Sequence, residues 1–339
     1  MYKTIITFCV LTGCVILAGK NTIQKFAVPV QNKAPLIDGK ISPGEWDNAA
    51  CFDGMQWKGE LLKRSGKAYL TADKKAIYIA VTTELPQKGR IFSNIKRNNA
   101  SLVRDDAIEI FVDPTPDSTD GTRYQFMMNS TGYHTYAAHS RGTANSLKNW
   151  NGKYDFKNSL DGKNWTAEIR IPIKSLAAEQ MISGLPWGIS ICRDWKQPWQ
   201  FSSIPGNFNG SDVRVYFKEN APIIRFLRTG DFYNKQITGK LFLKNTSSKS
   251  MDLGVLMLTT LDQMPEVRKS VKVLVGPGEN KVIDYDASTN AQNCDNVVFE
   301  VKVVNGNEVC YSREYKWNSK MGQYWTTVQE EALPFDFEF

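Results

Sequence analysis

The sequence has few of the features that common enzymes and membrane proteins need. Its 339 residues include only two histidines, His134 and His139, so few side chains can act as a base near neutral pH. It contains no G-x-S-x-G elbow and no H-E-x-x-H pair, which are motifs of α/β-hydrolases and zinc peptidases. No run after the N-terminal segment is apolar enough to span a bilayer. A common hydrolase and a polytopic helical membrane protein are therefore disfavoured.

Cysteine is also sparse and carries no motif. No CxxC, CxxCH or Cys/His zinc spacing is present. Cys294 and Cys310 flank a predicted hairpin whose turn is Asn305-Gly306. In that hairpin Cys310 should lie opposite a residue close to Val301. A disulfide between the two cysteines is therefore not expected.

Charge of one sign is not concentrated anywhere. The net charge is +7, but lysines and arginines are scattered among acids rather than gathered in a basic patch. We therefore expect no nucleic-acid partner. The positive excess is better suited to solubility or to adhesion to an anionic surface.

The N-terminus has the pattern of an export signal. One lysine precedes an apolar run from Thr4 to Ala18, which is shorter than the ~20 residues that cross a bilayer. We expect a signal peptide over 1–19 and a protein that is secreted or held in the cell envelope. "LTGC" resembles a lipobox, which would make Cys14 a lipidation site and the membrane contact a lipid anchor. An ordinary cleavage site in "VILAG" is the alternative.

Short alternating runs separated by Gly, Pro, Asn and Asp fill the rest of the chain. Examples are "AIYIAVTTE", "AIEIFVD", "WTAEIRIPI" and "VVFEVKVV". This spacing favours an all-β fold of β-sandwiches over βαβ units. Helical pattern is scarce, with a short helix or turn expected at "SPGEWDNA", capped by Ser42, and another at "KSLAAEQ".

The composition changes near "FKENAPIIR". Irregular, aromatic-rich loops lie before this stretch, and plainer alternating strands lie after it. We therefore expect two domains, one over 27–219 and an immunoglobulin-like sandwich of unassigned role over 222–339. The sequence does not indicate an oligomeric state.

The stretch "SLVRDDAIEIFVDPTPD" places acids on a strand. Ile108, Ile110 and Val112 alternate, so they can bury one face. Glu109 and Phe111 then lie on the other face, which is expected to meet either solvent or a polar ligand.

Several stretches in order resemble a known family. They are "PLIDGKISPGEWDNAA", "LTADKKAIYIAVTTE", "RDDAIEIFVDP", "RYQFMMNSTGY", "DGKNWTAEIRIPIKSL" and "PWGISICRDW". Together they are similar to family 9 carbohydrate-binding modules and their DOMON-like relatives over about residues 33–217. The resemblance implies that the first domain is a jelly-roll or immunoglobulin-like β-sandwich. It also implies a polysaccharide or oligosaccharide partner and a non-catalytic role in polysaccharide degradation or capture.

The resemblance also implies site residues. Glu109 in "D-x-x-E-I-F" and Asn129 closing "Q-F-x-x-N" match positions that face the ligand in sugar-binding members. Three matching positions depart from those members, because this chain has Val103 for a stacking tryptophan, Met127 for an arginine and Cys192 for a glutamine.

Other residues could replace the missing contacts. Arg193, Trp195 and Trp199 in "CRDWKQPWQ" and Trp150 in "KNWNGKY" offer ring faces and a forked donor. The alternative is that these tryptophans plug the ends of the core. Trp46, Trp165 and Trp187 lie within the structural motifs and are expected in the core.

Three further possibilities remain open. Asp113, Asp117 and Asp120 could hold the structural calcium that the family often binds, or form a solvated turn. A glycosidase acting on O-glycosyl bonds would need two carboxylates that flank a cleft. A haem-binding DOMON-type redox module would use residues such as Met127, Met128 and His134, although methionines commonly fill a core.

Overall fold

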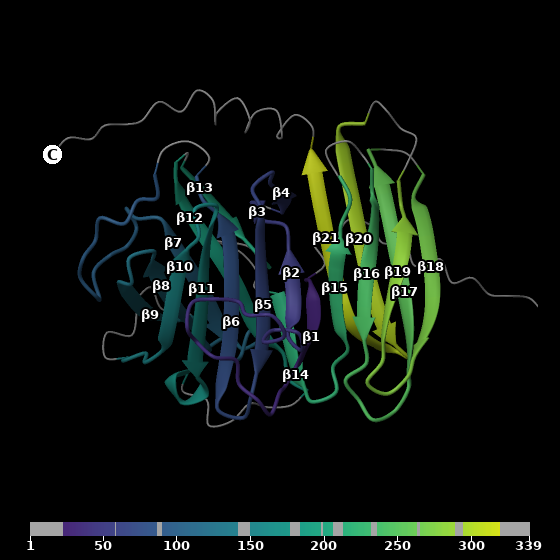
Figure 1. Ribbon diagram of the computed structural model, residues 1–339, viewed down its shortest axis with the longest axis horizontal. Coiled ribbons are helices and arrows are strands. Elements are labelled where there is room, and N and C mark those ends of the chain that lie inside the picture. The colour runs from purple at the N-terminus through teal and green to yellow at the C-terminus, as the bar shows by residue number, and fades with distance from the viewer. Residues whose placement is uncertain are drawn as a thin grey trace, which may run out of the picture.

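The computed structural model describes residues 23–57, 59–86, 90–141, 150–176, 184–197, 199–205, 213–231, 236–262, 265–288 and 294–318. Two β-sandwiches lie side by side (Figure 1), and a short 3₁₀ helix, η1 (Ile173–Leu176), is the only helical element in these ranges. The all-β prediction of two sandwiches is confirmed. The expected signal peptide and Cys14 lie outside the described residues.

The first sandwich has two layers. One layer contains β3 (Gln56–Trp57), β4 (Glu60–Leu61), β7 (Ala107–Asp113), β8 (Thr122–Asn129), β9 (His134–Ser140), β12 (Trp187–Lys196) and β13 (Trp199–Ser203), with β1 (Lys25–Pro29) and β14 (Val213–Lys218) alongside. The other contains β2 (Ala50–Asp53), β5 (Gly66–Ala72), β6 (Ala76–Glu84), β10 (Asp155–Leu160) and β11 (Asn164–Pro172).

The core between these layers follows the alternation of the strands. Ile108, Ile110 and Val112 of β7 are fully buried in it, as the sequence predicted. Trp165 and Trp187 are also buried in this core, and Trp46 is buried in a smaller cluster. The second face of β7 is not exposed, however, because every residue of this strand is buried. Glu109 is therefore covered on the outer face of its sheet.

A single carboxylate joins the start of the domain to β11. Glu168 is fully buried and accepts hydrogen bonds from Trp46 Nε1 at 2.8 Å, Gly39 N at 2.9 Å and Asp38 N at 3.0 Å. Gly39 has φ +90°, and a Cβ there would lie 2.9 Å from the backbone of Asn158. Only glycine fits this position without strain, which explains the "IDG" motif structurally.

The second sandwich has two smaller layers. One contains β17 (Met251–Leu261), β18 (Val267–Val275), β20 (Asn296–Asn305) and β21 (Glu308–Asn318), and the other contains β15 (Ile223–Arg228), β16 (Thr238–Lys244) and β19 (Asn280–Asp286). The predicted boundary near 220–222 falls in the connection between β14 and β15.

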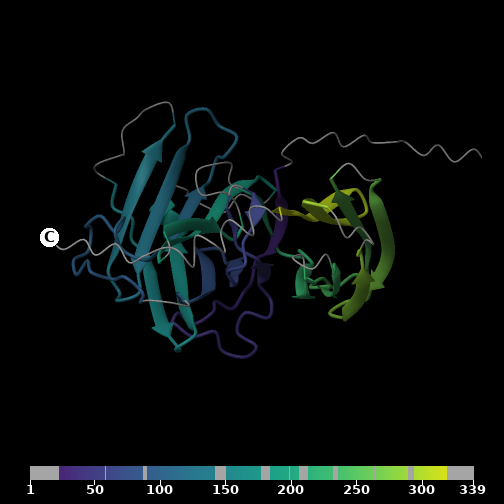
Figure 2. The same ribbon diagram turned by 90° about the horizontal axis from the view of Figure 1, so that it is seen from above.

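A continuous sheet crosses this boundary. β21 pairs antiparallel with β1 through Phe26 and Tyr311, and it pairs parallel with β4 through Glu60 and Lys316. Figure 2 shows β1 and the end of β21 at the junction of the two sandwiches. The strand order of the sheet therefore runs through both halves.

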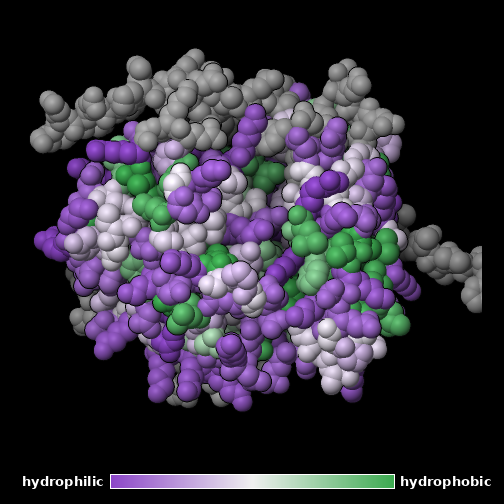
Figure 3. Space-filling model, in the orientation of Figure 1, coloured by the Kyte–Doolittle hydropathy of each residue, from purple (hydrophilic) through white to green (hydrophobic). Residues whose placement is uncertain are grey.

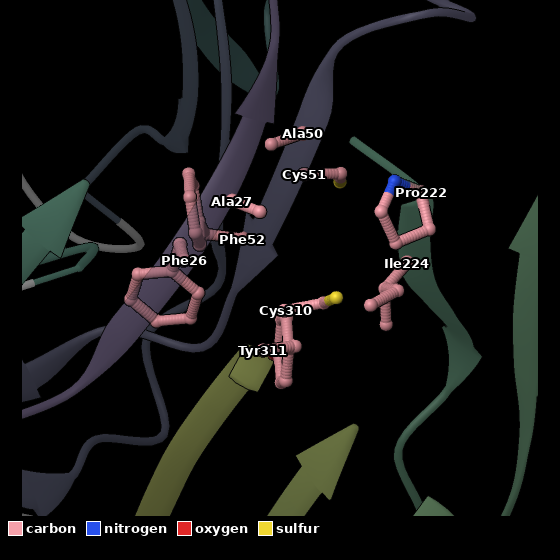
Figure 4. A pocket seen from close by; sticks show the side chains of 9 residues that line it. All are labelled: Phe26, Ala27, Ala50, Cys51, Phe52, Pro222, Ile224, Cys310 and Tyr311. Carbon is pink, nitrogen blue, oxygen red and sulfur yellow. The ribbon is translucent and has the colours of Figure 1, made fainter. Parts of the chain in front are cut away.

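Two thiols line a small cavity at the junction. Figure 4 shows Cys51 of β2 and Cys310 of β21 at this cavity, opposite Pro222 and Ile224. Burial raises the pKa of the Cys51 thiol to about 11 and also raises that of Cys310. Both thiols are free, and they stay protonated and unreactive at neutral pH.

The hairpin of β20 and β21 corrects one detail of register. Val303 pairs with Tyr311 and Val304 pairs with Val309, so Cys310 lies at a bulge. Its nearest partners are thus two to three residues beyond the expected position near Val301. Cys294 is a buried thiol.

The two stretches expected to form a short helix or a turn form turns and a 3₁₀ helix. The stretch after Ser42 forms turns rather than a helix, with Glu45 N bonded to Ser42 O at 3.2 Å. The stretch at Lys174 forms η1, and 177–180 lie outside the described residues.

The surface seen in Figure 3 is mainly hydrophilic, with an apolar patch over the second sandwich. Leu227, Val271, Leu274 and Val282, on β15, β18 and β19, are among the exposed apolar side chains of this half. In the described ranges, no helix has the length and hydropathy of a membrane span.

Candidate functional site

The outer face of β13, β12, β7, β8 and β9 concentrates polar and aromatic side chains. The strand register places the residues of each pair on the same face, since paired residues share a side of the sheet. The side chains on this outer face include Trp199, Phe201, Lys196, Asp194, Cys192, Glu109, Phe111, Met127, Gln125, Arg123 and His139. We call this group the outer-face site.

Glu109 is fixed in place at the centre of this site. Its Oε1 accepts a hydrogen bond from Gln125 Nε2, and Gln125 Oε1 lies 2.7 Å from His139 Nε2. Burial lowers the pKa of His139, so the neutral ring can donate its Nε2–H to Gln125. Glu109 Oε2 has no hydrogen-bond partner among the described residues. The chain of three side chains therefore fixes the orientation of the Glu109 carboxylate.

Asp194 lies beside Glu109 on the neighbouring strand. Glu109 pairs with Cys192 and Asp194 pairs with Ala107, so the two carboxyl groups are diagonal neighbours. Burial and the charge of Glu109 raise the pKa of Asp194 to about 8. Burial likewise raises the pKa of Glu109, against the opposing effects of Gln125 and Arg123. Burial therefore favours the protonated form of both carboxyl groups, and the charge of Glu109 adds to this effect at Asp194.

Lys196 and an aromatic cluster form the rim. Lys196 Nζ lies 4.5 Å from the centre of the Trp199 ring and has no hydrogen-bond partner in the described part of the chain. Trp199 is 58% exposed. Its ring meets Phe201 edge-on at 6.0 Å, and Phe201 in turn contacts Trp57 at 5.7 Å. An exposed ring face thus lies next to unpartnered charged groups, an arrangement suited to a polar ligand with an apolar face.

A family model matches the strands that hold Glu109 and Gln125, and the match ends just before Asp194, Lys196 and Trp199. Residues 37–193 match the carbohydrate family 9 binding domain-like model. This region is a family 9 carbohydrate-binding module. The resemblance found in the sequence is thereby confirmed. A search of curated proteins found no match.

Solved structures of similar proteins were also found. A family 9 carbohydrate-binding module from Caldicellulosiruptor kristjanssonii in complex with glucose is 16% identical over 57% of this chain and 95% of its own, with a TM-score of 0.41. A putative carbohydrate-binding protein from Bacteroides uniformis is 15% identical over 58% of this chain and 100% of its own, with a TM-score of 0.46.

Two residues expected at the site of the family 9 module lie on the opposite face of β12. Arg193 pairs with Ile108 and is fully buried, with its Nη2 2.8 Å from Asp106 Oδ1. Trp195 is also fully buried and donates its Nε1–H to Ser202 Oγ at 2.8 Å. Both belong to the interior of the sandwich, so the direct contacts with a ligand that the sequence suggested for them are corrected.

Asn129 holds a loop of the module. It is fully buried, and its Nδ2 donates to Asp105 Oδ2 at 2.9 Å and to Ile95 O at 3.1 Å. Its Oδ1 accepts from the backbone of Thr131 and Tyr133. All of these groups are protein groups, so Asn129 shapes the end of β8 and is not an exposed ligand contact.

Trp150 occupies the other side of the same sheet. It packs against the main core, and its ring lies 4.9 Å from Tyr124 and 5.7 Å from Phe126. Its Nε1 donates to Ser175 O at 2.8 Å. The alternative interpretation as a core plug therefore fits Trp150 better than a role in ligand stacking. Val103 is 55% exposed, but it offers no ring.

The three aspartates proposed for calcium do not converge. Asp113 is buried in an ion pair with Arg141, Asp117 is exposed and lies 2.9 Å from Arg214, and Asp120 accepts from Ser118. The described residues contain no group of three side chains that could hold a metal ion. The donor set therefore does not fit the calcium site that the sequence suggested.

The residues considered for haem also face different surroundings. Met128 is fully buried in the main core, whereas Met127 packs with Leu102 and Ala107 on the other face of the sheet. The ring of His134 lies edge-on to Tyr154 at 5.3 Å. Met127 and Met128 therefore cannot both be directed at one cofactor from β8.

Sequence reasoning missed Asp194, Lys196, Gln125 and Arg123. The signal was present in the two-residue period of "WGISICRDWK". Cys192, Asp194 and Lys196 lie on the same face of the sheet as Glu109, whereas Arg193 and Trp195 lie on the face that packs against the core. Assigning every second residue of β12, from Cys192 onward, to the face of Glu109 would have identified the outer-face residues.

Proposed function

We propose that this protein binds a saccharide on the outer-face site of its family 9 module without cleaving it. The observation that carries the proposal is a set of unpartnered polar atoms, Glu109 Oε2, Asp194 Oδ1 and Lys196 Nζ, beside the exposed ring of Trp199. Sugar hydroxyls both donate and accept hydrogen bonds, so they can satisfy all three atoms. The C–H face of the ring can stack on Trp199.

We propose further that the protein is exported and acts in capturing or degrading polysaccharide. The apolar N-terminal run and "LTGC" support export, with Cys14 as the candidate lipid anchor. Labelling with a palmitate analogue tests the anchor. Labelled wild type and unlabelled Cys14→Ser are expected, and unlabelled wild type that is still exported would leave only the ordinary signal.

The pair of carboxyl groups is the one observation that favours the alternative, glycoside hydrolysis. Glu109 and Asp194 are neighbouring carboxyl groups, and burial raises the pKa of each, as a general acid requires. A glycosidase, however, places its two carboxyl groups on either side of the scissile bond. Here both project from the same face of one sheet. This placement supports hydrogen bonding to one side of a bound sugar rather than attack on a glycosidic bond from two sides.

A glycan array with the full chain tests the proposal, followed by calorimetry on each oligosaccharide that binds. Trp199→Ala and Glu109→Gln are each expected to weaken binding about tenfold or more, which corresponds to ~1.4 kcal/mol. Leu274→Ala, an exposed change on the second sandwich, is the control and should bind as wild type. Release of reducing sugar by wild type but not by Glu109→Gln would instead support the hydrolase.

A further inference from the structure

The second sandwich has a long sheet edge at β18, on its side far from the first sandwich (Figure 1). Within the described ranges β18 pairs with β17 alone, so its other edge presents backbone N–H and C=O groups. Six of its nine residues are exposed. An exposed edge of this length is a template on which another extended segment can pair as an added strand.

One side of β18 continues the core of the second sandwich. Val271 and Val273 lie on this side, because they pair with Val255 and Leu253 of β17, which are buried in the core. Val273 is buried as well, but Val271 is 43% exposed. The apolar side of the edge is therefore left partly uncovered.

The opposite side of β18 is positively charged. Arg268 and Lys272 alternate with the core-facing residues, and both are exposed. Arg268 lies 3.2 Å from Glu266, its neighbour in sequence. A segment that pairs with this edge should therefore present apolar side chains on one side and acidic side chains on the other.

A segment with this pattern follows β21 in the sequence. Residues 333–339, which lie outside the described residues, read "LPFDFEF". Phenylalanines alternate with acids over the last five positions. In an extended conformation the three phenylalanines would share one side, and Asp336 and Glu338 would share the other.

We propose that residues 333–339 pair with the exposed edge of β18 in the same chain, as an added strand of the second sandwich. The phenylalanines then extend the core over Val271, and the two acids lie beside Arg268 and Lys272. Backbone hydrogen bonds hold such a strand, and its alternating side chains select the edge and the side. The proposal concerns the second sandwich alone and is independent of saccharide binding.

The connecting segment is long enough for this pairing. β18 is separated from β21 by three strand spacings in the sheet, which is about 15 Å at ~4.8 Å per spacing. Residues 319–332 join the end of β21 to the proposed strand, and these 14 residues can span up to about 45 Å when extended.

The edge of β19 suits the segment less well. β19 is the last strand of the other layer, and Asp284 and Asp286 are exposed on it. An acidic segment at that edge would bring like charges next to each other, which destabilises a pair of strands. Charge therefore favours β18 over β19.

Amide hydrogen exchange of the full chain, resolved to single amides of β18, tests the proposal. The amides of β18 that do not bond to β17 should exchange at least about tenfold more slowly in wild type than in Phe337→Ser, since pairing protects them. Phe337→Leu keeps an apolar side chain and should retain most of the protection. Gln329→Ser, which precedes the proposed strand, is the control and should exchange as wild type.

Reversal of charge tests which side of the segment meets which side of β18. Arg268→Glu with Lys272→Glu should speed exchange about threefold or more, and so should Asp336→Lys with Glu338→Lys. All four changes together should restore exchange to within about twofold of wild type. Lys302→Glu, exposed on β20 of the same sheet, should have no effect. Failure of the fourfold variant to recover protection would overturn the assigned pairing.

Two further outcomes would overturn the proposal. Equal exchange in wild type and Phe337→Ser would show that the segment does not cover this edge. Protection that increases with protein concentration would show that a second copy supplies the strand. Circular dichroism checks that each variant is folded, and the charge-reversal set keeps the test decisive if Phe337→Ser does not fold.

Discussion

Arg193 and Asp106 form an ion pair inside the first sandwich, with 2.8 Å between Nη2 and Oδ1 and no solvent exposure of either side chain. The guanidinium lies over two tryptophan rings, 4.8 Å from the centre of Trp165 and 4.3 Å from that of Trp195. Asp106 Oδ2 also accepts from Phe92 N at 2.7 Å. This pair ties the start of β7 to β12 and removes Arg193 from the face where a ligand could meet it.

Asp106→Ala is expected to destabilise the protein by about 3–5 kcal/mol, because it leaves a guanidinium buried without a counter-charge. Asp155→Ala is the control, since its ion pair with Arg170 at 3.0 Å is exposed and such pairs contribute about 0–1 kcal/mol. Urea unfolding measures both. The double variant Asp106→Leu with Arg193→Met should recover much of the loss, and equal losses in Asp106→Ala and Asp155→Ala would contradict the buried pair.

Trp195→Ala should mainly lower folding stability, whereas Trp199→Ala should mainly weaken saccharide binding. The buried Trp195 supports the core, so its loss should cost about 3–5 kcal/mol of folding stability. The exposed Trp199 should cost about 0.5 kcal/mol or less while weakening any saccharide that binds. Thermal unfolding and calorimetry on the same two variants separate these roles. A stability loss in Trp199→Ala as large as in Trp195→Ala would show that Trp199 is a structural residue.

Stability should fall as the pH rises from about 4 to about 8 because of Asp194. Its pKa is near 3.8 in the unfolded chain and about 8 in the folded protein, raised first by burial and then by the charge of Glu109. The native state therefore binds more protons than the unfolded state across this window, and the free energy of unfolding decreases with pH. Asp194→Asn should flatten this decline. Urea unfolding over this range for both proteins measures it, and an unchanged slope in the variant would assign the decline to other groups.

Glu168→Ala should destabilise the first sandwich. It leaves the Trp46 Nε1–H and the backbone N–H groups of Asp38 and Gly39 without their acceptor, and each buried unsatisfied donor costs about 1–3 kcal/mol. A loss of at least ~2 kcal/mol is expected in urea unfolding. Asp161→Ala, at an exposed turn, should cost less, and the reverse order would contradict the structural role of Glu168.

A fragment that ends at Glu219 is expected to fold alone, with lower stability than the full chain. The first sandwich keeps both of its layers, but β1 and β4 lose their pairing with β21. The ring of Phe26 also loses its contact with Tyr311 at 5.1 Å. Far-ultraviolet circular dichroism and urea unfolding test this. A fragment without cooperative unfolding would show that the two sandwiches fold as one unit.

The sequence alone determined the β-class, the core face of β7 and the family of the first domain. Alternation of apolar residues is a local property, so Ile108, Ile110 and Val112 could be assigned without knowing their neighbours. The predicted boundary near 220–222 falls in the connection between β14 and β15, and the division into two domains stays a prediction. Trp46 was assigned to the core because of its bulk within a motif, whereas the need for glycine at position 39 depends on the distant backbone of Asn158.

Only the tertiary structure decided which polar groups meet. The alternation of β12 already separates Asp194 from Arg193, but the position of Asp194 opposite Ala107 and diagonal to Glu109 depends on the register of β12 against β7. Burial of Glu109 and Asn129 depends on segments distant in sequence, which cover faces that alternation leaves unassigned. The pairing of β21 with β1 and β4 is likewise non-local. Sequence thus fixed the periodicity of each strand, whereas the pairing between strands fixed the charges that share the site.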